Sequence, residues 1–156
     1  MFIEYSQTEI GLIKIIANDK AVCKIELNAK HLEPESSNNI TNKCSKQLNE
    51  YFSGQRTCFD IPIDPIGTHF QLKVWKALCD IPYGETRCYG DIAAVIGNAK
   101  AQRAVGMANN KNPIPIIIPC HRVIGKNGSL TGYAGGINTK KKLLELEKQN
   151  SNTKRI

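Results

Sequence analysis

The second half of the chain is organised around one unusual stretch, which reads Asn112-Pro-Ile-Pro-Ile-Ile-Ile-Pro-Cys-His-Arg-Val123. Each proline lacks a backbone N–H and has a fixed φ, so the isoleucines between them should be held stiffly but cannot form a central ladder strand. We therefore expect a rigid, β-like segment over 114–118. Pro119 restricts the backbone immediately before Cys120, and a rigid support of this kind can hold a reactive side chain in one position.

Helical patterns precede this stretch. Apolar residues at helical spacing predict helices over 70–79, 89–96 and 99–109. Gly97 is expected to end the second helix, and Asn98 is expected to cap the third. Two short helices joined by a tight turn that contains glycine predict a helix-turn-helix.

The residues after the stretch predict a loop and a final helix. Five glycines between 125 and 136 indicate a loop in which the backbone could approach a ligand closely. The last helix is expected to begin at Asn138 or Thr139 and to end near 148, with a frayed tail from Gln149.

The first 65 residues predict a smaller module that mixes strands with one helix. Pro62, Pro65 and Gly67 mark its end, so we place a domain boundary near 66. The predicted fold class is α+β, with a small N-terminal α/β module over 1–65 and a mostly helical C-terminal domain over 66–156. The elements expected in the module are strands over 2–5, 11–17 and 21–27, a loop over 28–41, a helix over 43–52 and another strand over 58–63.

Composition favours an ordinary globular protein. The chain has 156 residues, of which 41% are hydrophobic and 22% charged, so a packed core is expected. We recognise no signal peptide and no run of 18 apolar residues, which predicts no membrane span and a cytoplasmic location. The six cysteines include no C-x-x-C pair, so their spacing argues against a zinc ribbon or a disulfide framework and favours reduced thiols.

The net charge of +7 is concentrated in one part of the sequence, because no acidic residue occurs between Asp91 and Glu145. A one-signed run of this length favours a polyanionic partner such as nucleic acid, since each neutralised phosphate releases counterions. The alternative is a solvated basic surface that binds nothing. The basic residues in this run are Lys100, Arg103, Lys111, Arg122, Lys126, Lys140, Lys141 and Lys142.

Cys120 and His121 are the residues best suited to carry chemistry. Glu147 shares a face of the last helix with Leu143 and Leu144, and a carboxylate beside core leucines needs a partner because an unpaired buried charge is costly. His121 is the candidate partner, which would give a Cys–His–Glu relay in which the histidine accepts the thiol proton and the glutamate orients the ring. An inert buried cysteine, a surface histidine and a solvated glutamate form the alternative, and these residue types alone leave both open.

A resemblance to a known family favours the reactive alternative. The stretch from Asn112 to Val123 resembles the active-site signature of the O6-alkylguanine-DNA alkyltransferases, also called methylated-DNA–protein-cysteine methyltransferases. The resemblance covers roughly residues 66–148, and the Pro-Cys-His-Arg motif is highly specific. Further matches lie at Tyr83-Gly84-Glu85, Tyr89, Arg103-Ala-Val-Gly106, Tyr133-Ala-Gly-Gly136 and Glu147.

The resemblance implies DNA repair by direct, irreversible, single-turnover transfer of an alkyl group from O6 of guanine to Cys120. His121 would act through a water as the base, and Glu147 would polarise it. Tyr89 would hydrogen-bond the guanine ring and help to flip the nucleotide, while Asn112 would tie the helix-turn-helix to the active site. No cofactor and no metal are implied.

The implied partner is double-stranded DNA containing O6-alkylguanine, bound by a monomer through the minor groove and independently of sequence. Arg103 would enter the duplex and replace the flipped base. Many members of the family have serine where this chain has Ala134, so one hydroxyl near the guanine oxygen is missing. Phosphate contacts are implied for Gly90, Asn98 and Lys126, and a substrate pocket for Val123, Tyr133, Ala134 and Gly135.

Three alternatives make different demands on Cys120. A lesion sensor that binds alkylguanine without reacting would not need a cysteine at this position, which this chain retains. A cysteine hydrolase built on Cys120, His121 and Glu147 would have to fit its geometry to adjacent Cys and His residues, and it would not explain the acid-free run. A basic helical interaction module would tolerate Cys120→Ala, whereas an alkyltransferase would not.

Overall fold

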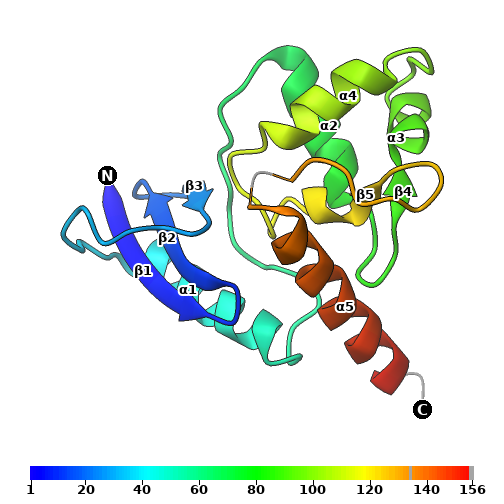
Figure 1. Ribbon diagram of the computed structural model, residues 1–156. Coiled ribbons are helices and arrows are strands. Elements are labelled where there is room, and N and C mark those ends of the chain that lie inside the picture. The colour runs from blue at the N-terminus through cyan, green and yellow to red at the C-terminus, as the bar shows by residue number, and fades with distance from the viewer. Residues whose placement is uncertain (134, 155–156) are drawn as a thin grey trace. The chain divides into compact units, whose positions relative to one another are not determined.

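The computed structural model describes residues 1–133 and 135–154, and it divides the chain into two compact units, Met1–Ile66 and Gly67–Ile156. The first unit is a three-stranded sheet with one helix, and the second consists mainly of helices (Figure 1). This arrangement confirms the predicted α+β fold class. No helix in the described residues is long and apolar enough to span a membrane.

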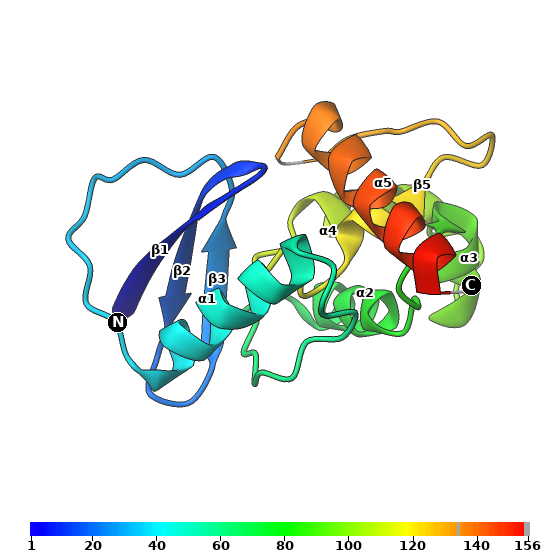
Figure 2. The ribbon, with the colours of Figure 1, turned by 90° about the horizontal axis from the view of Figure 1, so that it is seen from below.

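The sheet of the first unit is an antiparallel meander, as predicted, and its central strand is buried on both faces. Ile13 and Ile15 point to the face along which α1 packs (Figures 1 and 2). Lys14 points to the opposite face and pairs with Glu33 of the loop that covers it. The elements are β1 (Phe2–Thr8), β2 (Gly11–Ala17), β3 (Val22–Glu26) and α1 (Asn39–Phe52).

Two predictions for this unit are wrong. The helix begins earlier than expected because Asn38 and Thr41 form a capping box, in which each side-chain oxygen accepts a hydrogen bond from the other residue's backbone N–H. Residues 58–63 do not form a strand, and only Ile63 pairs with Val22, as an isolated bridge. The proline that precedes Ile63 has no N–H to donate, so a regular ladder cannot continue through it.

The second unit has the predicted helices, although several of their ends differ. The indole N–H of Trp75 donates to the Ala108 carbonyl at 2.8 Å and so fixes α2 to α4. The two helices of the predicted helix-turn-helix, α3 and α4, are joined by a turn in which Gly97 has a φ of 81°. The elements are α2 (His69–Cys79), β4 (Arg87–Cys88), α3 (Tyr89–Val95), α4 (Gln102–Asn110), the single 3₁₀ turn η1 (Cys120–Arg122), β5 (Val123–Ile124) and α5 (Ile137–Lys154).

Asn98 does not cap α4. This helix begins at Gln102, its N-cap residue is Ala101, and no side chain accepts a hydrogen bond at that cap. The Asn98 carbonyl instead accepts a hydrogen bond from the Ala101 N–H, in a tight turn that precedes the helix. The predicted frayed tail from Gln149 is also wrong, because α5 continues to Lys154.

The proline-rich segment folds into turns rather than the extended run that its sequence predicts. Asn112 holds this shape, because its side-chain oxygen accepts the Ile114 N–H at 2.9 Å and its side-chain nitrogen donates to the Ile118 carbonyl at 2.7 Å. Ile116 has a φ of 76°, a left-handed conformation that is strained for a β-branched residue. Three of the four isoleucines, Ile114, Ile116 and Ile118, are buried, so packing holds the strained turn in place.

Thr68 caps α2 through a reciprocal capping box with Gln71, and the same helix carries Trp75, the only tryptophan of the sequence. We predict that Thr68→Ala lowers the free energy of unfolding of the second unit by about 1 kcal/mol, because the Gln71 N–H loses its acceptor. Thr68→Ser keeps the hydroxyl and should retain most of the stability. Urea denaturation followed by Trp75 fluorescence measures both variants, and an alanine variant as stable as the parent protein would contradict this role of the cap.

Candidate functional site

Cys120 begins the turn η1 and is 4% exposed. Its backbone is fixed on both sides, because the Cys120 N–H donates to the Ile118 carbonyl at 2.8 Å and the Asn109 side chain donates to the Cys120 carbonyl at 3.4 Å. Burial raises the pKa of the Cys120 thiol to about 11, although a hydrogen bond with Asn112 and the positive charge of Lys140 act in the opposite direction. The resting side chain is therefore a protonated thiol.

His121 and Arg122, the next two residues of η1, bind the carboxylate of Glu147 on α5. The His121 Nε2 atom lies 2.6 Å from Glu147 Oε2. Arg122 donates from Nε to Oε1 at 2.8 Å and from Nη2 to Oε2 at 3.0 Å, and the Gly84 N–H donates to Oε1 at 3.2 Å. All three side chains are buried, so the structure excludes the alternative of a surface histidine and a solvated glutamate.

The electrostatics of this cluster favour a neutral histidine beside an ionised glutamate. Burial alone would raise the pKa of Glu147, but hydrogen bonds from His121 and Arg122 and the guanidinium charge outweigh it and hold that pKa far below its usual range. Burial lowers the pKa of His121, and the Glu147 carboxylate reverses only part of that effect. Since a carboxylate only accepts, Nε2 carries the proton and Nδ1 is the basic nitrogen. Nδ1 is buried and has no hydrogen-bond partner within the described part of the chain.

The sequence predicts His121 as the partner of Glu147, and the structure adds Arg122 and the Gly84 N–H. Arg122 could have been found, because it follows His121 directly and an arginine beside a buried motif needs a carboxylate. Gly84 could not, because its contact is made by a backbone N–H 63 positions away in sequence. Gly84 also has a φ of 80°, a conformation that glycine adopts readily.

The glycine-rich loop after β5 carries the predicted pocket residues. The hydroxyl oxygens of Tyr89 and Thr131 lie 3.0 Å apart, so this loop is tied to the first residue of α3. The Tyr133 hydroxyl is buried and has no partner among the residues that the structure describes, and burial raises its pKa well above the usual value. Of the other predicted pocket residues, Val123 and Gly135 are buried, and Ala134 lies outside the described residues.

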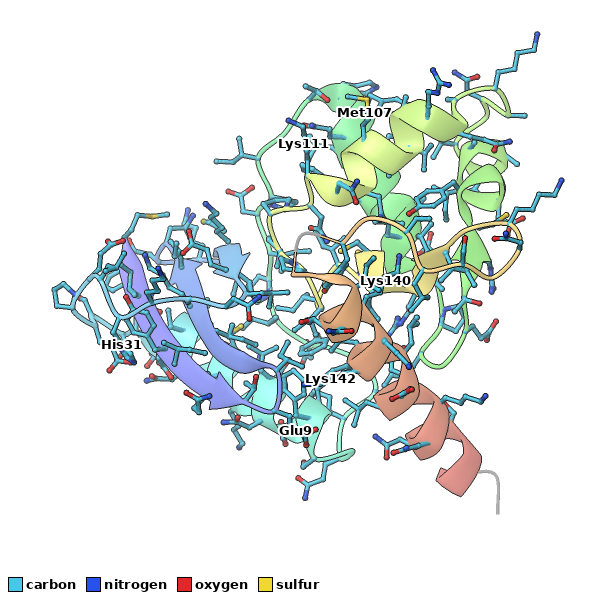
Figure 3. The ribbon with its side chains drawn as sticks, in the orientation of Figure 1. Glu9, His31, Met107, Lys111, Lys140 and Lys142 are labelled. Atoms are coloured by element: carbon cyan, nitrogen blue, oxygen red, sulfur yellow. The ribbon has the colours of Figure 1, made fainter. Side chains whose placement is uncertain are left out.

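The side chains predicted to contact DNA lie on the surface of the second unit. Arg103 on α4 is exposed, Met107 follows it on the same helix, and Lys111 caps the end of that helix (Figure 3). A Cβ atom added at Gly106 would lie 3.8 Å from the Tyr89 ring, which is ordinary van der Waals contact, so this ring packs beside α4. Among the residues predicted to contact phosphates, Asn98 and Lys126 are exposed and Gly90 is half-buried.

The basic run of the sequence does not face solvent as a whole. Arg122 is 7% exposed and its charge is matched by Glu147, and Lys140 is fully buried. Neither side chain can meet a phosphate in this conformation, so the sequence overstates the basic surface. The exposed members of the run are Lys100, Arg103, Lys111, Lys126, Lys141 and Lys142.

The remaining cysteines differ widely in burial. They are free thiols, as Cys120 is, and their surroundings range from exposed to buried. Within residues 1–133 and 135–154, no group of three or more His, Cys, Asp or Glu side chains could hold a metal ion.

Two domains of one protein family match this chain. Residues 69–149 match the DNA binding domain of 6-O-methylguanine DNA methyltransferase, and residues 1–65 match its ribonuclease-like domain. The chain belongs to the 6-O-methylguanine DNA methyltransferase family. This confirms the resemblance that the Pro-Cys-His-Arg motif carries.

Individual members of the family resemble the chain over nearly its full length. The methylated-DNA–protein-cysteine methyltransferase of Methanosarcina barkeri is 49% identical over 156 residues, which cover 96% of this chain and 99% of the relative. The crystal structure of Mycobacterium tuberculosis OGT in complex with DNA has a TM-score of 0.88 and 45% identity, and the match covers 96% of this chain and 94% of that one. An O6-methylguanine DNA methyltransferase from Methanococcus jannaschii has a TM-score of 0.69 and 32% identity, with 93% of each chain covered.

In this member of the methyltransferase family, we predict that Glu147→Gln lowers the free energy of unfolding by about 3–5 kcal/mol, because it leaves the buried Arg122 guanidinium without a counter-charge. Glu145 lies on the exposed side of the same helix. Glu145→Gln removes the same charge and should change stability by less than about 0.5 kcal/mol. Urea denaturation at pH 7 measures both variants.

The same pair of variants has a pH signature. The folded pKa of Glu147 lies below the ordinary value of 4.5, so its ionisation stabilises the fold above pH 4.5 and this contribution is lost as the pH falls toward the folded value. The parent protein and Glu145→Gln should therefore lose stability steeply below pH 4.5, and Glu147→Gln should lose it less steeply. Equal acid slopes would show that Glu147 is not held ionised.

Proposed function

We propose that this protein repairs DNA by moving the alkyl group from O6 of guanine in duplex DNA to the Sγ atom of Cys120. Membership of the methyltransferase family supports this activity, and the similar structure solved in complex with DNA supports DNA as the partner. The observation that carries the proposal is the position of Cys120 in a buried turn, where the next residue, His121, is kept neutral by burial and is oriented by Glu147.

The reaction is a direct substitution at the alkyl carbon. A bond forms between Cys120 Sγ and that carbon while the bond from the carbon to O6 breaks, and guanine keeps the electron pair. The thiol proton passes through a water to Nδ1 of His121, and a proton is finally returned to guanine. The product is a thioether without a chemical route back to the thiol, so each molecule acts once.

Resting thiolate is not the source of the rate. With a pKa of about 11, Cys120 is ionised in about one molecule in ten thousand at pH 7. The proton must therefore leave as the sulfur attacks, and the neutral His121 ring, oriented by Glu147, suits that task. Most of the acceleration comes from holding the alkyl carbon in line with Sγ and from stabilising the departing guanine, through Tyr89 and backbone N–H groups near Gly135.

The damaged nucleotide leaves the base stack before it reacts, because a cysteine in a buried turn cannot reach O6 inside a duplex. Arg103 enters from α4 and fills the vacated space, and Tyr89 hydrogen-bonds the guanine ring. Asn112 links the helix-turn-helix to the active site, since it holds the segment between α4 and Cys120. α4 approaches through the minor groove, where shape and phosphates are read more than sequence.

The remaining predicted residues complete this assignment. The protein acts as a monomer without a cofactor, and the C-terminal domain over 66–156 carries both DNA binding and alkyl transfer. Ala134 supplies no hydroxyl to the guanine oxygen, so only backbone groups are available at its position. Phosphates are contacted by Gly90, Asn98 and Lys126, and the guanine pocket is lined by Val123, Tyr133, Ala134 and Gly135.

Mass spectrometry of the intact protein tests the transfer. After incubation with a duplex containing O6-methylguanine, the protein should gain one methylene, about 14 Da, once per molecule and on Cys120. Cys120→Ser should bind the duplex without a gain in mass, and Cys58→Ser, which changes an exposed thiol, should react like the parent protein. A parent protein that binds the duplex but keeps its mass would instead support a lesion sensor.

Arg103 is tested against Lys100, an exposed residue of the same charge just before α4. We predict that Arg103→Ala slows methyl transfer at saturating DNA about tenfold or more, because extrusion of the base costs a few kcal/mol that the arginine partly offsets. Lys100→Ala should change affinity for the duplex but not this rate. A mismatched base opposite the lesion is easier to extrude and should restore part of the Arg103→Ala rate. Equal rates for the two variants would remove Arg103 from the extrusion step.

A further inference from the structure

Lys140 is a lysine inside the protein. It lies in the first turn of α5 and is fully buried, whereas Lys141 and Lys142, the next two residues of that helix, are exposed. Figure 3 labels Lys140 near the N-terminal end of α5 and Lys142 farther along the helix. Burial lowers the pKa of Lys140, and only the nearness of Cys120 acts in the opposite direction.

The Lys140 ammonium group is satisfied by backbone carbonyls. Its Nζ atom donates to the Val123 carbonyl at 2.6 Å and to the Thr131 carbonyl at 3.0 Å. No carboxylate lies within ion-pair distance of Lys140 among the described residues. A buried cation without a counter-charge is costly, so a hydrophobic residue at this position would serve stability alone at least as well.

The two carbonyls belong to parts of the chain that flank the reaction centre. Val123 follows directly after the turn that carries Cys120. Thr131 lies within the glycine-rich loop, and its hydroxyl contacts the Tyr89 hydroxyl. Tyr133 is two residues farther along this loop. Lys140 thus joins the cysteine side of the pocket to the side that carries the two tyrosines.

We propose that Lys140 is a positioning residue for alkyl transfer. By donating hydrogen bonds to both the Val123 and the Thr131 carbonyl, it sets the distance between Cys120 and the opposite wall of the pocket. That wall is formed by Tyr89, Thr131 and Tyr133. Its charge has a second effect on the same step. A fixed cation close to Cys120 favours the negative sulfur that develops during attack, and it does so without reorganisation because its position is already held. This inference rests on the proposed function.

Lys140→Met tests the inference, because methionine fills a similar volume without charge or donor, and Lys142→Met is the matched control that removes the same charge from an exposed position. The first-order rate of methyl transfer is measured with a saturating duplex containing O6-methylguanine. Lys140→Met should be slower by about tenfold to a hundredfold, because the pocket wall is no longer fixed. Its affinity for undamaged duplex should stay within about twofold of the parent value, as phosphates meet only the exposed lysines. Lys142→Met should match the parent protein in transfer rate, because its exposed side chain bonds to neither of these two carbonyls.

A second measurement separates positioning from a purely structural role. The rate at which iodoacetamide modifies Cys120 is followed against pH, with peptide mapping to distinguish Cys120 from the other thiols. Near pH 7, Cys120 of Lys140→Met should be modified severalfold more slowly than Cys120 of the parent protein, because the small thiolate fraction loses a nearby cation. Lys142→Met should be modified at the parent rate. An unchanged modification rate near pH 7 and an unchanged transfer rate in Lys140→Met would overturn the inference.

Two further outcomes are distinguishable. If the parent protein and Lys142→Met also fail to gain the methyl group, the proposed function fails; if both react and Lys140→Met reacts equally fast, only the role of Lys140 fails. If Lys140→Met does not fold, Lys140→Gln, which keeps an amide donor for the carbonyls, takes its place and should show the same slower modification of Cys120 near pH 7. Failure of both variants to fold would assign Lys140 to stability alone and refute the proposal.

Discussion

The second unit depends on the hydrogen bonds that the buried carboxylate of Glu147 accepts. This carboxylate accepts hydrogen bonds from His121, Arg122 and the Gly84 N–H, which belong to η1 and to the segment between α2 and β4. A single side chain of α5 therefore fixes the last helix, the reactive turn and that segment to one another. An isolated charge at this depth would be strongly destabilising, so the donors and the carboxylate require each other. The same contacts orient the His121 ring, and burial keeps it neutral, which is the state a base needs.

The second constraint is the backbone around Cys120. Two asparagines supply it: Asn109 binds the Cys120 carbonyl, and Asn112 holds the two ends of the isoleucine segment. The left-handed conformation of Ile116 is strained, and it persists because the surrounding packing leaves no room for another arrangement. Rigidity at this point matters chemically, since a thiol with a raised pKa gains little from ionisation and depends on being held in line with its target.

Much of this architecture follows from the sequence, because local rules decide it. The meander, the three helices before the reactive stretch and the pairing of His121 with Glu147 were all predicted from periodicity, turn residues and the cost of a lone buried charge. The errors arise where long-range contacts override local signals. Asn98 has the side chain of a cap but lies in the turn before α4, and the isoleucine run has strand propensity but is bent by the side chain of Asn112. Gly84 acts through its backbone, which no residue pattern reports.

The three consecutive lysines of α5 illustrate why charge counts mislead. Adjacent helical positions are about 100° apart, so three residues in a row span about 200° of the helix surface and can extend from the solvent side to the packed side. Leu143 and Glu147 lie three and seven positions after Lys140, on the same face of the helix. All three side chains are buried. The glycine-rich loop explains why a lysine is tolerated there: its backbone forms little regular structure, so its carbonyls need donors that a helix or sheet would otherwise provide. Of the three consecutive lysines that the sequence counts as surface charge, the structure exposes two, Lys141 and Lys142.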